Sequence, residues 1–405
     1  MANIAIMGYG TVGSGVYEAL QMNSASIAKR AGANVCVTRV LDLRAFPGDP
    51  AEGILTHQFD DVLNDETISV VAEVMGGVEP AFTFTKKLLA SGKSVVTSNK
   101  ALVAAHGAEL IALAKANSVS YLFEASVAGG IPILRTLVRS LAADEIIDIK
   151  GIVNGTTNYI LSKMTLEGSD YAAALKDAQA LGYAEADPTA DVEGHDAQRK
   201  IAILLSLALG KTVDFEDIET TGISGITAAD IAYAKMCGGV IKLLAAGRAD
   251  NGTVSARVAP VVVSAAHPLA VVNDAFNAVF VTGNVVDELM FYGRGAGKLP
   301  TASAVVGDIV ECVQAMAEKR TVQIIWNDEK QTVSSFADYK EKRLFRVKGD
   351  ASCAPGGYGV PMTGAAPGEY ALISPAMTEC EWQAAKKALL ASGTAADICG
   401  EIIIL

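Results

Sequence analysis

What the sequence lacks excludes several classes of protein. No apolar run approaches the roughly 18 residues that a membrane-spanning helix needs, and the start, M-A-N-I-A-I-M, has no basic segment ahead of a hydrophobic signal. Six cysteines occur without C-x-x-C spacing and four histidines lie far apart, so neither a disulfide framework nor a zinc site is indicated. Positive charge is also short: 33 Lys and Arg stand against 45 Asp and Glu, and the net charge of −12 argues against a nucleic-acid partner. The sequence therefore predicts a soluble cytoplasmic protein with no membrane or nucleic-acid partner.

The length and the order of the patterns predict the fold class. A chain of 405 residues, 51% of them hydrophobic, can form two or three domains with a full core in each. Strands alternate with helices in the first third, and the middle shows the alternation of antiparallel strands. We expect an α/β protein with a Rossmann-type dinucleotide-binding domain over 1–130 and an α+β open-sheet substrate domain over 131–300. A helix at 301–320 then returns to the first domain, and a small α+β unit follows at 340–405.

A glycine pattern near the start predicts a dinucleotide site. A short strand, Asn3–Met7, leads directly into G-Y-G-T-V-G, and a helix is expected over Thr11–Met22. In this setting glycines allow a tight turn, backbone approach to a pyrophosphate at the helix N-terminus, and close helix–strand packing. The second strand, Val35–Leu41, ends in Asp42, which can bond a ribose 2′-hydroxyl. The alternative is a glycine-rich turn without a ligand. The candidate cofactor residues here are Gly8, Gly10, Gly13 and Asp42.

Two further glycine or polar segments follow predicted strands. The strand at 68–75 ends in Gly76, and the strand at 94–97 is followed by Asn99-Lys100 at a helix start. Such strand ends line the cofactor crevice, so Lys100 can serve the nicotinamide end or the substrate. The alternative is a solvated lysine at a helix start. Later, the segment G-R-G-A-G at 293–297 leaves bare backbone before a helix expected at Thr301. A cofactor can approach this glycine segment closely. The alternative is a flexible hairpin exit without a ligand.

For two polar segments, the sequence allows either a binding role or a purely structural role. Glu124 stands beside the glycine-rich bend A-S-V-A-G-G-I-P, which resembles an oxygen-only site for a hard cation, or is a bend with a solvated glutamate. The segment K-G-I-V-N-G-T-T-N at 150–158 is expected to form a strand and a polar turn, with Tyr159 starting a helix. Its Thr-Thr-Asn offers donors for a substrate carboxylate, or caps that helix.

The stretch from Gly182 to Lys200 is the strongest candidate for chemistry. It is an acidic loop that enters a helix at about Gly194–His195, because an apolar run with helical spacing follows. Asp196 and Lys200 are four residues apart and so share one helix face. A positioned acid–lysine pair suits proton transfer to a small polar substrate. The alternative is an ordinary surface salt bridge.

Several of these motifs, in this order, resemble those of homoserine dehydrogenase. They are G-Y-G-T-V-G, T-S-N-K-A-L, E-A-S-V-A-G-G-I-P, N-G-T-T-N-Y-I-L, G-Y-A-E-A-D-P…G-H-D-A-Q-R-K and G-R-G-A-G-K-L-P-T-A-S-A-V, and they cover residues 1 to about 318. The resemblance implies NAD(P)-dependent interconversion of L-aspartate 4-semialdehyde and L-homoserine, on the path to threonine and methionine. The rival hypotheses are a reductase of another small amino-bearing aldehyde or imine, and a dinucleotide-binding protein without catalysis.

The resemblance also implies roles for individual residues. Lys200 would be the proton donor, Glu185 and Asp196 would bind substrate, and Lys100 would assist near the reacting carbon. Glu124 and the carbonyls of Val127, Gly129 and Ile131 would hold a monovalent cation such as sodium. The cofactor would be touched by Gly8, Gly10, Thr11, Val12, Gly13, Asp42, Gly76, Asn99, Lys100, Gly182, Gly295 and Gly297. The family implies a homodimer or homotetramer, and the position of Gly8 implies a monofunctional enzyme without a preceding kinase.

Departures from the family pattern lead to two expectations. Lys298 adds a positive charge after G-A-G, and Leu41 stands where relatives often have Arg, with Arg44 two residues after Asp42. We expect Arg44 to lie too far round the loop to offset Asp42, so that NAD is used at least as well as NADP.

The last segment resembles an ACT regulatory domain that is reduced in its middle. Strands are expected at 343–348, 369–373 and 398–405, and a helix at 379–390. Residues 350–368 hold too many prolines and glycines for the missing helix. We therefore expect no feedback by threonine, and an interface role for this tail.

Overall fold

The structure is a computed structural model that describes residues 1–250, 252–391 and 397–405. By its contacts the chain forms two units: residues 1–146, 202–215 and 282–331 make the first, and residues 147–201, 216–281 and 332–405 the second. These two units do not test the domain boundaries expected from the sequence, and those boundaries stay a prediction. None of the helices in the described part of the chain is both long and apolar enough to cross a bilayer.

The first unit is built on a six-stranded, fully parallel sheet of strand order β3-β2-β1-β4-β5-β6. The central strands β1, β4 and β5 are almost wholly buried because helices cover both faces of the sheet, whereas β2 is only partly buried. This confirms the predicted Rossmann-type sheet. The elements are β1 (Ala2–Met7), α1 (Thr11–Met22), α2 (Ser24–Ala31), β2 (Val35–Leu41), β3 (Leu55–Thr56), α3 (Phe59–Leu63), β4 (Ile68–Glu73), α4 (Ala81–Ala90), β5 (Ser94–Thr97), α5 (Lys100–Ala116) and β6 (Tyr121–Leu122).

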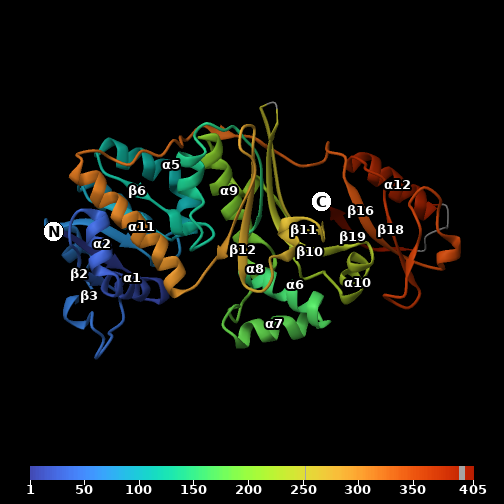
Figure 1. Ribbon diagram of the computed structural model, residues 1–405, viewed down its shortest axis with the longest axis horizontal. Helices are drawn as coiled ribbons and strands as arrows, with labels where there is room; N and C mark the ends of the chain where they lie inside the picture. The colour runs from blue at the N-terminus through green and yellow to red at the C-terminus, as the bar shows by residue number, and fades with distance from the viewer. Residues whose placement is uncertain (251, 392–396) are drawn as a thin grey trace. The chain divides into compact units, whose positions relative to one another are not determined.

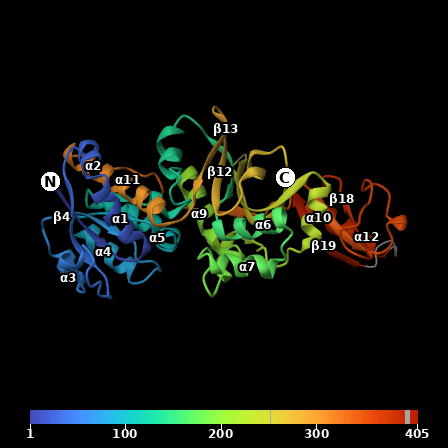
Figure 2. The same ribbon diagram turned by 60° about the horizontal axis from the view of Figure 1, so that its bottom comes forward.

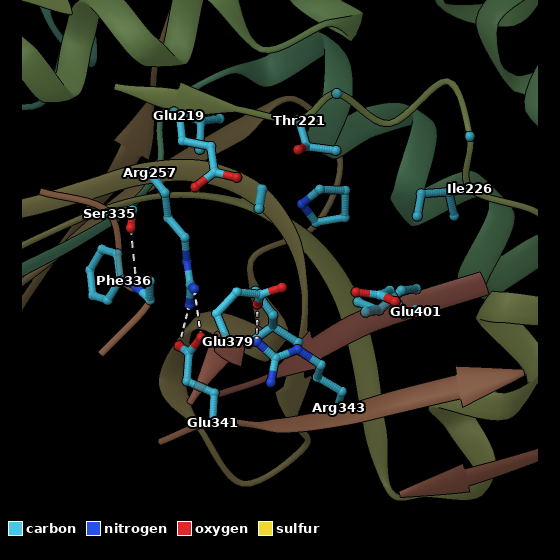
Figure 3. A pocket seen from close by; sticks show the side chains of 18 of the residues that line it. Glu219, Thr221, Ile226, Arg257, Ser335, Phe336, Glu341, Arg343, Glu379 and Glu401 are labelled. Atoms are coloured by element: carbon cyan, nitrogen blue, oxygen red, sulfur yellow. Dashed lines mark hydrogen bonds and ion pairs between the residues drawn. The ribbon is translucent and has the colours of Figure 1, made fainter. Parts of the chain in front are cut away.

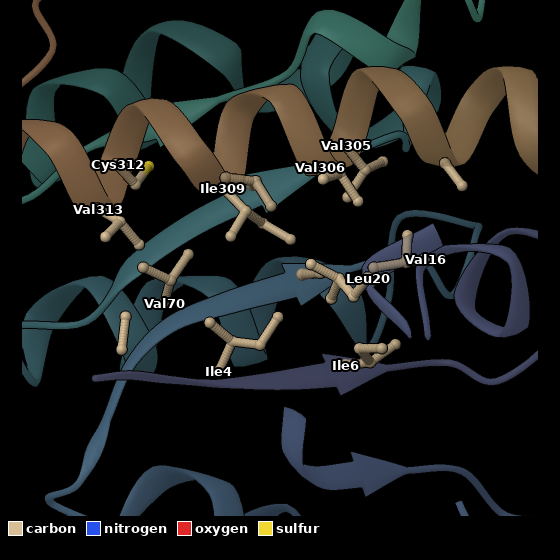
Figure 4. Close-up of a cluster of buried hydrophobic side chains, with 14 of the residues drawn as sticks. Ile4, Ile6, Val16, Leu20, Val70, Val305, Val306, Ile309, Cys312 and Val313 are labelled. Atoms are coloured by element: carbon tan, nitrogen blue, oxygen red, sulfur yellow. The ribbon is translucent and has the colours of Figure 1, made fainter. Parts of the chain in front are cut away.

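A helix from far along the sequence completes the core of the first unit. α11 (Lys298–Ala317) packs beside α1 over β1 and β4, and Figure 4 shows Ile309 and Val313 of α11 pointing at the strands that carry Ile4 and Val70. The two helices approach closely at Gly15, where a Cβ atom would lie 2.6 Å from the Lys298 carbonyl oxygen. The helix starts at Lys298, three residues before the expected Thr301, and it packs on the sheet of the first unit; the predicted division into domains stays a prediction.

The second unit contains a long, mixed sheet. β10 and β11 form an antiparallel hairpin of twelve residue pairs, and the strand order around them is β12-β7-β10-β11-β19-β16-β18-β17. Helices α6 and α7 lie side by side (Figure 2). The elements up to the hairpin and its neighbours are β7 (Ile146–Ile152), α6 (Gly155–Glu167), α7 (Tyr171–Ala180), α8 (Thr189–Val192), α9 (His195–Leu209, shared by the two units), β9 (Glu219–Thr220), α10 (Ala228–Met236), β10 (Gly239–Asp250), β11 (Thr253–Ser264) and β12 (Phe276–Gly283). The strand β13 (Asp287–Arg294) belongs to the first unit.

The tail belongs to this same sheet. β19 (Asp397–Ile404) pairs with β11 on one side and with β16 (Lys342–Lys348) on the other (Figure 1). Phe345, Tyr370 and Trp382 form its small core. The predicted tail strands and helix are present to within a residue or two, and the 350–368 segment contains only a single 3₁₀ turn and a two-residue strand. The remaining elements are β8 (Thr212–Val213), β14 (Lys330–Gln331), β15 (Val333–Ser334), β17 (Met362–Thr363), β18 (Glu369–Ile373) and α12 (Glu379–Ala391).

Candidate active site

The Asp196–Lys200 pair lies in the interior of the second unit. α9 begins after Gly194, whose φ of +85° and close contact with Thr220 both require glycine. Asp196 is 2% exposed and Lys200 8% exposed. The Lys200 Nζ donates to Asp196 Oδ2 at 2.7 Å and to the Val153 carbonyl at 2.6 Å. The alternative of a solvated surface salt bridge is therefore wrong, and the lysine is held in one position.

Two polar residues that the sequence did not single out, Asn154 and Asp191, complete this cluster. Asn154 precedes α6, and its Nδ2 donates to Asp191 Oδ1 at 2.7 Å and to Asp196 Oδ2 at 2.8 Å. Thr156 lies 3.4 Å from the second Asp191 oxygen and donates to the Tyr183 carbonyl. Asp191 was hidden among the other acids of the 182–200 stretch. Asn154 had a usable signal, since an Asn before Gly-Thr-Thr is a typical helix N-cap.

The Thr-Thr-Asn segment is helical rather than a polar turn. α6 starts at Gly155, so the expectation that Tyr159 starts the helix was wrong by about one turn. Asn154 Oδ1 accepts from the Thr157 N–H at 2.9 Å, and the Asn158 Nδ2 donates to three carbonyls of the 272–276 loop. Thr157 and Asn158 are 1% exposed and lie inside α6, and the residue that caps this helix is Asn154 rather than the Thr-Thr-Asn segment. A contact of that segment with a substrate carboxylate stays a prediction.

Glu185 and Gly182 lie in an exposed segment of the same unit. Gly182 has a φ of +76° after α7, and the Glu185 main-chain carbonyl accepts from Gln179 at 3.1 Å. The Glu185 carboxylate is exposed. The structure thus brings Lys200 and Asp196 together but does not place Glu185 in contact with them, and the roles of Glu185 and Gly182 stay predictions.

The glycine-rich turn of the first unit has the geometry that a pyrophosphate requires. Gly8 has a φ of +92°, and a Cβ atom on Gly13 would lie 1.9 Å from the Gly8 carbonyl oxygen. Gly10 precedes α1, and Thr11 and Val12 form its first turn, where main-chain N–H groups have no partner within the helix. No side chain other than glycine fits at Gly13, so the N-terminus of α1 can approach a ligand closely.

Asp42 directly follows β2, and its carboxylate accepts several hydrogen bonds. Its carboxylate accepts from the Tyr9 main-chain N–H at 2.7 Å and from the Arg44 Nε and NH2 at 3.0 and 2.9 Å. The Arg44 guanidinium beside it lowers the pKa of Asp42 to about 2. The expectation that Arg44 lies too far away was wrong, because the 43–44 turn brings its side chain back over Asp42. Lys298 in turn pairs with Glu18 of α1 at 2.6 Å.

The ends of β4 and β5 meet in a buried hydrogen-bonded network. Glu73, which the sequence did not single out, is fully buried and accepts from the Thr97 hydroxyl at 2.6 Å and the Met75 N–H at 2.9 Å. Burial raises the pKa of Glu73. Asn99 caps α5 and donates to the Gly77 carbonyl at 2.6 Å. This network fixes the turn after Gly76 (φ +97°) and places Lys100, half-buried, as the first residue of α5.

The predicted cation site is a bend that packs against the second glycine turn. A Cβ atom on Gly129 would lie 2.4 Å from the Gly295 carbonyl oxygen, and Gly130 donates to the Arg294 carbonyl at 3.1 Å. Both Glu124 carboxylate oxygens accept main-chain N–H groups, from Leu134 at 2.9 Å and Arg135 at 2.7 Å. The carboxylate of Glu124 therefore fixes this segment, while each of its oxygens keeps a lone pair for a further ligand contact.

A polar cavity of about 640 Å³ lies elsewhere in the second unit, between β9, β11 and the tail. Figure 3 shows Arg257 facing Glu341, with N···O distances of 2.5 and 2.7 Å, and Arg343 facing Glu379 at 2.6 Å. Of the described residues that line this cavity, none is a candidate for catalysis or for cofactor binding.

A glycine-rich turn on a parallel sheet and a buried lysine–aspartate pair define a nicotinamide-dependent oxidoreductase. The sequence matches the NAD-binding domain of homoserine dehydrogenase over residues 8–124 and the homoserine dehydrogenase family over residues 132–310. The chain belongs to the homoserine dehydrogenase family. It is an enzyme that acts on a CH–OH group and interconverts L-aspartate 4-semialdehyde and L-homoserine, so the rival hypotheses of another reductase and of a non-catalytic protein are not favoured.

Individual relatives agree with this assignment. The homoserine dehydrogenase of Bacillus subtilis (strain 168) is 47% identical over 316 residues, which span 77% of this chain and 73% of that protein. The homoserine dehydrogenase of Mycobacterium tuberculosis (strain H37Rv) is 49% identical over 315 residues, 76% of this chain and 71% of that protein.

Solved structures extend the similarity to the tail. A homoserine dehydrogenase from Thiobacillus denitrificans has a TM-score of 0.90 at 35% identity and covers 100% of this chain and 98% of its own. A hyperthermophilic archaeal homoserine dehydrogenase, determined in complex with NADPH, has a TM-score of 0.65 at 29% identity and covers 77% of this chain and 97% of its own.

Proposed function

We propose that Lys200 is the proton donor of the reaction and that Asp196 holds it in place. The observation that carries this proposal is the burial of the pair, with the Lys200 Nζ bonded to Asp196 and to the Val153 carbonyl. A buried ion pair with no function is a weak source of stability. A fixed ammonium group in the interior is, in contrast, useful wherever negative charge develops on a substrate oxygen.

The chemistry of the reducing direction needs such a group. The nicotinamide supplies the hydride to the aldehyde carbon, and negative charge then grows on the aldehyde oxygen. The Lys200 ammonium stabilises that charge and delivers the proton, a contribution typically worth about 10²–10⁴ in rate. Glu185 binds the ammonium group of the substrate and Lys100 assists near the reacting carbon. The positions of Lys100 at the start of α5 and of Glu185 in the exposed 183–188 segment support these roles.

The adenosine end of the cofactor is held by the turn at 8–13, by Asp42 and by Gly76. The pairing of Asp42 with Arg44 favours the use of both NAD and NADP, because the guanidinium offsets the charge that would repel a 2′-phosphate. The Gly295–Gly297 turn, Gly182 and Asn99 complete the proposed contacts with the cofactor.

A monovalent cation such as sodium would be held at this bend by Glu124 and by the main-chain carbonyls of Val127, Gly129 and Ile131. Each Glu124 carboxylate oxygen accepts one main-chain N–H and keeps a lone pair for such an ion. We also propose a cytoplasmic homodimer or homotetramer that supplies threonine and methionine biosynthesis. Complementation of a homoserine auxotroph, together with light scattering during gel filtration, would test these points.

The role of Lys200 is tested by substitution. Lys200→Ala should lower kcat at least ~10²-fold while the folded protein still binds cofactor. Glu185→Gln should raise KM more than it lowers kcat, since that contact exists in the ground and transition states alike. Lys163→Ala, which removes an exposed lysine of α6 paired with Glu167, is the matched control. If Lys200→Ala keeps near-normal turnover and Lys100→Ala loses it, the proton donor is Lys100.

A further inference from the structure

We infer that Asn154 is a positioning residue that holds Asp191 and Asp196 together and thereby fixes the Lys200 ammonium. The inference rests on the proposed role of Lys200. It starts from one atom: the Asn154 Nδ2 lies 2.7 Å from Asp191 Oδ1 and 2.8 Å from Asp196 Oδ2. A single amide nitrogen thus donates both of its protons to two different carboxylates, in a side chain that is 5% exposed.

The direction of the Asn154 amide is set by the helix that it caps. Its Oδ1 accepts from the Thr157 main-chain N–H at 2.9 Å and from the Thr157 hydroxyl at 3.0 Å. A flipped amide would place its oxygen against two carboxylates and its NH₂ group against an N–H donor, which loses every one of these bonds. The start of α6 therefore aims the NH₂ group at Asp191 and Asp196.

This arrangement acts on Lys200 through two of its acceptors. One acceptor is the Val153 carbonyl, which is adjacent in the chain to Asn154, and the other is Asp196 Oδ2, the same oxygen that Asn154 bonds. Asp191 and Asp196 are like charges brought close together, which is unfavourable unless donors bridge them. Without the amide, this donor no longer bridges the two carboxylates, which repel each other, and Asp196 no longer holds the ammonium in one place.

The competing explanation is that Asn154 only caps α6. Two substitutions separate the roles. Asn154→Ser keeps a good N-cap residue but is too short to bridge two carboxylates, and Asn154→Asp keeps both the size and the capping oxygen but removes the donor. Asp170→Ser makes the same kind of change at the N-cap of α7, where Asp170 accepts from the Ala173 N–H, and is the matched control.

In the reducing direction, we expect Asn154→Ser to lower kcat about 10- to 100-fold with KM for L-aspartate 4-semialdehyde changed less than about threefold, because the alignment of Lys200 matters in the transition state. The primary isotope effect from C4-deuterated reduced cofactor should rise as the chemical step becomes limiting. Asp170→Ser should leave kcat unchanged. Turnover within about threefold of wild type for Asn154→Ser and Asn154→Asp would overturn the inference and leave Asn154 as a cap. If the serine variant does not fold, the aspartate variant gives the same test.

A double substitution shows whether Asn154 acts through Lys200. In a Lys200→Ala background, Asn154→Ser should reduce kcat by less than about twofold further, since residues that work as a unit are not additive. Independent, multiplied losses would overturn the inference while leaving the role of Lys200 intact. Normal turnover of Lys200→Ala alone would instead refute the proposed proton donor, and the positioning role with it.

Discussion

Arg44 is the residue whose position changes the expected cofactor preference. Its guanidinium neutralises Asp42, whose pKa of about 2 keeps the carboxylate ionised at any working pH. We expect Arg44→Ala to lower kcat/KM for NADP about tenfold, while the value for NAD changes less than about twofold, because a bare carboxylate then meets the 2′-phosphate. Steady-state kinetics with both cofactors measure this. Arg39→Ala, in β2 and paired with Asp65 at 3.7 Å, is the control. Equal losses for the two cofactors would show that Arg44 has no part in discrimination.

The sequence predicts some site residues and not others for physical reasons. Asp196 and Lys200 are recognisable because a spacing of four puts them on one helix face. Asn154 meets Asp191 and Asp196 only in three dimensions, across 37 and 42 residues of chain, and no local spacing reports such a contact. Arg44 was misjudged because a side chain can fold back over a residue two positions earlier, which distance along the chain does not show.

At the scale of elements, the buried Lys242 of β10 ties α6 to the 272–276 loop. Its Nζ donates to the Val272 carbonyl, to Asn158 Oδ1 at 3.2 Å and to Asn273 Oδ1 at 3.1 Å. Burial lowers the pKa of Lys242 to about 8, and the nearby Asp274 carboxylate partly opposes this. The folded protein therefore releases this proton near pH 8, whereas the unfolded chain keeps it up to about 10.5.

The consequence is a stability that depends on pH in a defined direction. Between pH 8 and 10.5 Lys242 is protonated in the unfolded chain but largely neutral in the folded protein, so the unfolded chain binds more protons. Lys242 therefore makes the free energy of unfolding rise with pH, by at most ~1.4 kcal/mol per pH unit. This added stability is lost again as the pH falls through 8. Urea unfolding at pH 7.5, 8.5 and 9.5 should show this slope in wild type and a smaller one in Lys242→Met. The exposed Lys163→Met serves as control. Parallel curves for Lys242→Met and wild type would contradict the assignment.

Element types were predictable where periodicity is strong, and element starts were not. β2 and β5 were predicted to the residue because their apolar runs are bounded by turn residues. The start of α6 was missed, since Thr-Thr-Asn has the composition of a turn and becomes helical only because Asn154 caps it and the 272–276 loop accepts Asn158. The two-residue strands β9 and β15 depend wholly on β11 as a partner, and so have no signal of their own.

At the scale of the whole molecule, the tail is joined to the substrate sheet by charge as well as by β19. Arg257 of β11 and Glu341 form a two-fold ion pair with side chains only 11% and 16% exposed. Glu341→Gln leaves a largely buried guanidinium without its counter-ion, which typically costs about 3–5 kcal/mol. We expect a clear fall in Tm by calorimetry. Asp397→Asn, in an exposed pair with Lys348, should change Tm little. A Glu341→Gln variant as stable as wild type would show that the pair is dispensable.

The reduced middle of the tail leads to the expectation that threonine does not regulate the enzyme. Residues 350–368 form a 3₁₀ turn and one short strand in place of the helix of an intact ACT domain, so a regulatory pocket there lacks a rigid edge. Activity measured at subsaturating substrate should not respond to added threonine. Strong, saturable inhibition would contradict this. Valine, which carries a methyl group in place of the hydroxyl, is the control for nonspecific effects.

The first unit is assembled from three separate stretches of chain, and α11 is among the last of them. Until residues 298–317 leave the ribosome, the face of the nascent parallel sheet that α11 later covers has only α1 and α2 over it, and residues such as Ile4 and Val70 stay in water. Synthesis of some 170 residues separates β6 from that helix, which at 5–20 residues per second takes roughly ten to thirty seconds. The hydrophobic core of the nucleotide-binding unit can therefore be completed only late in translation.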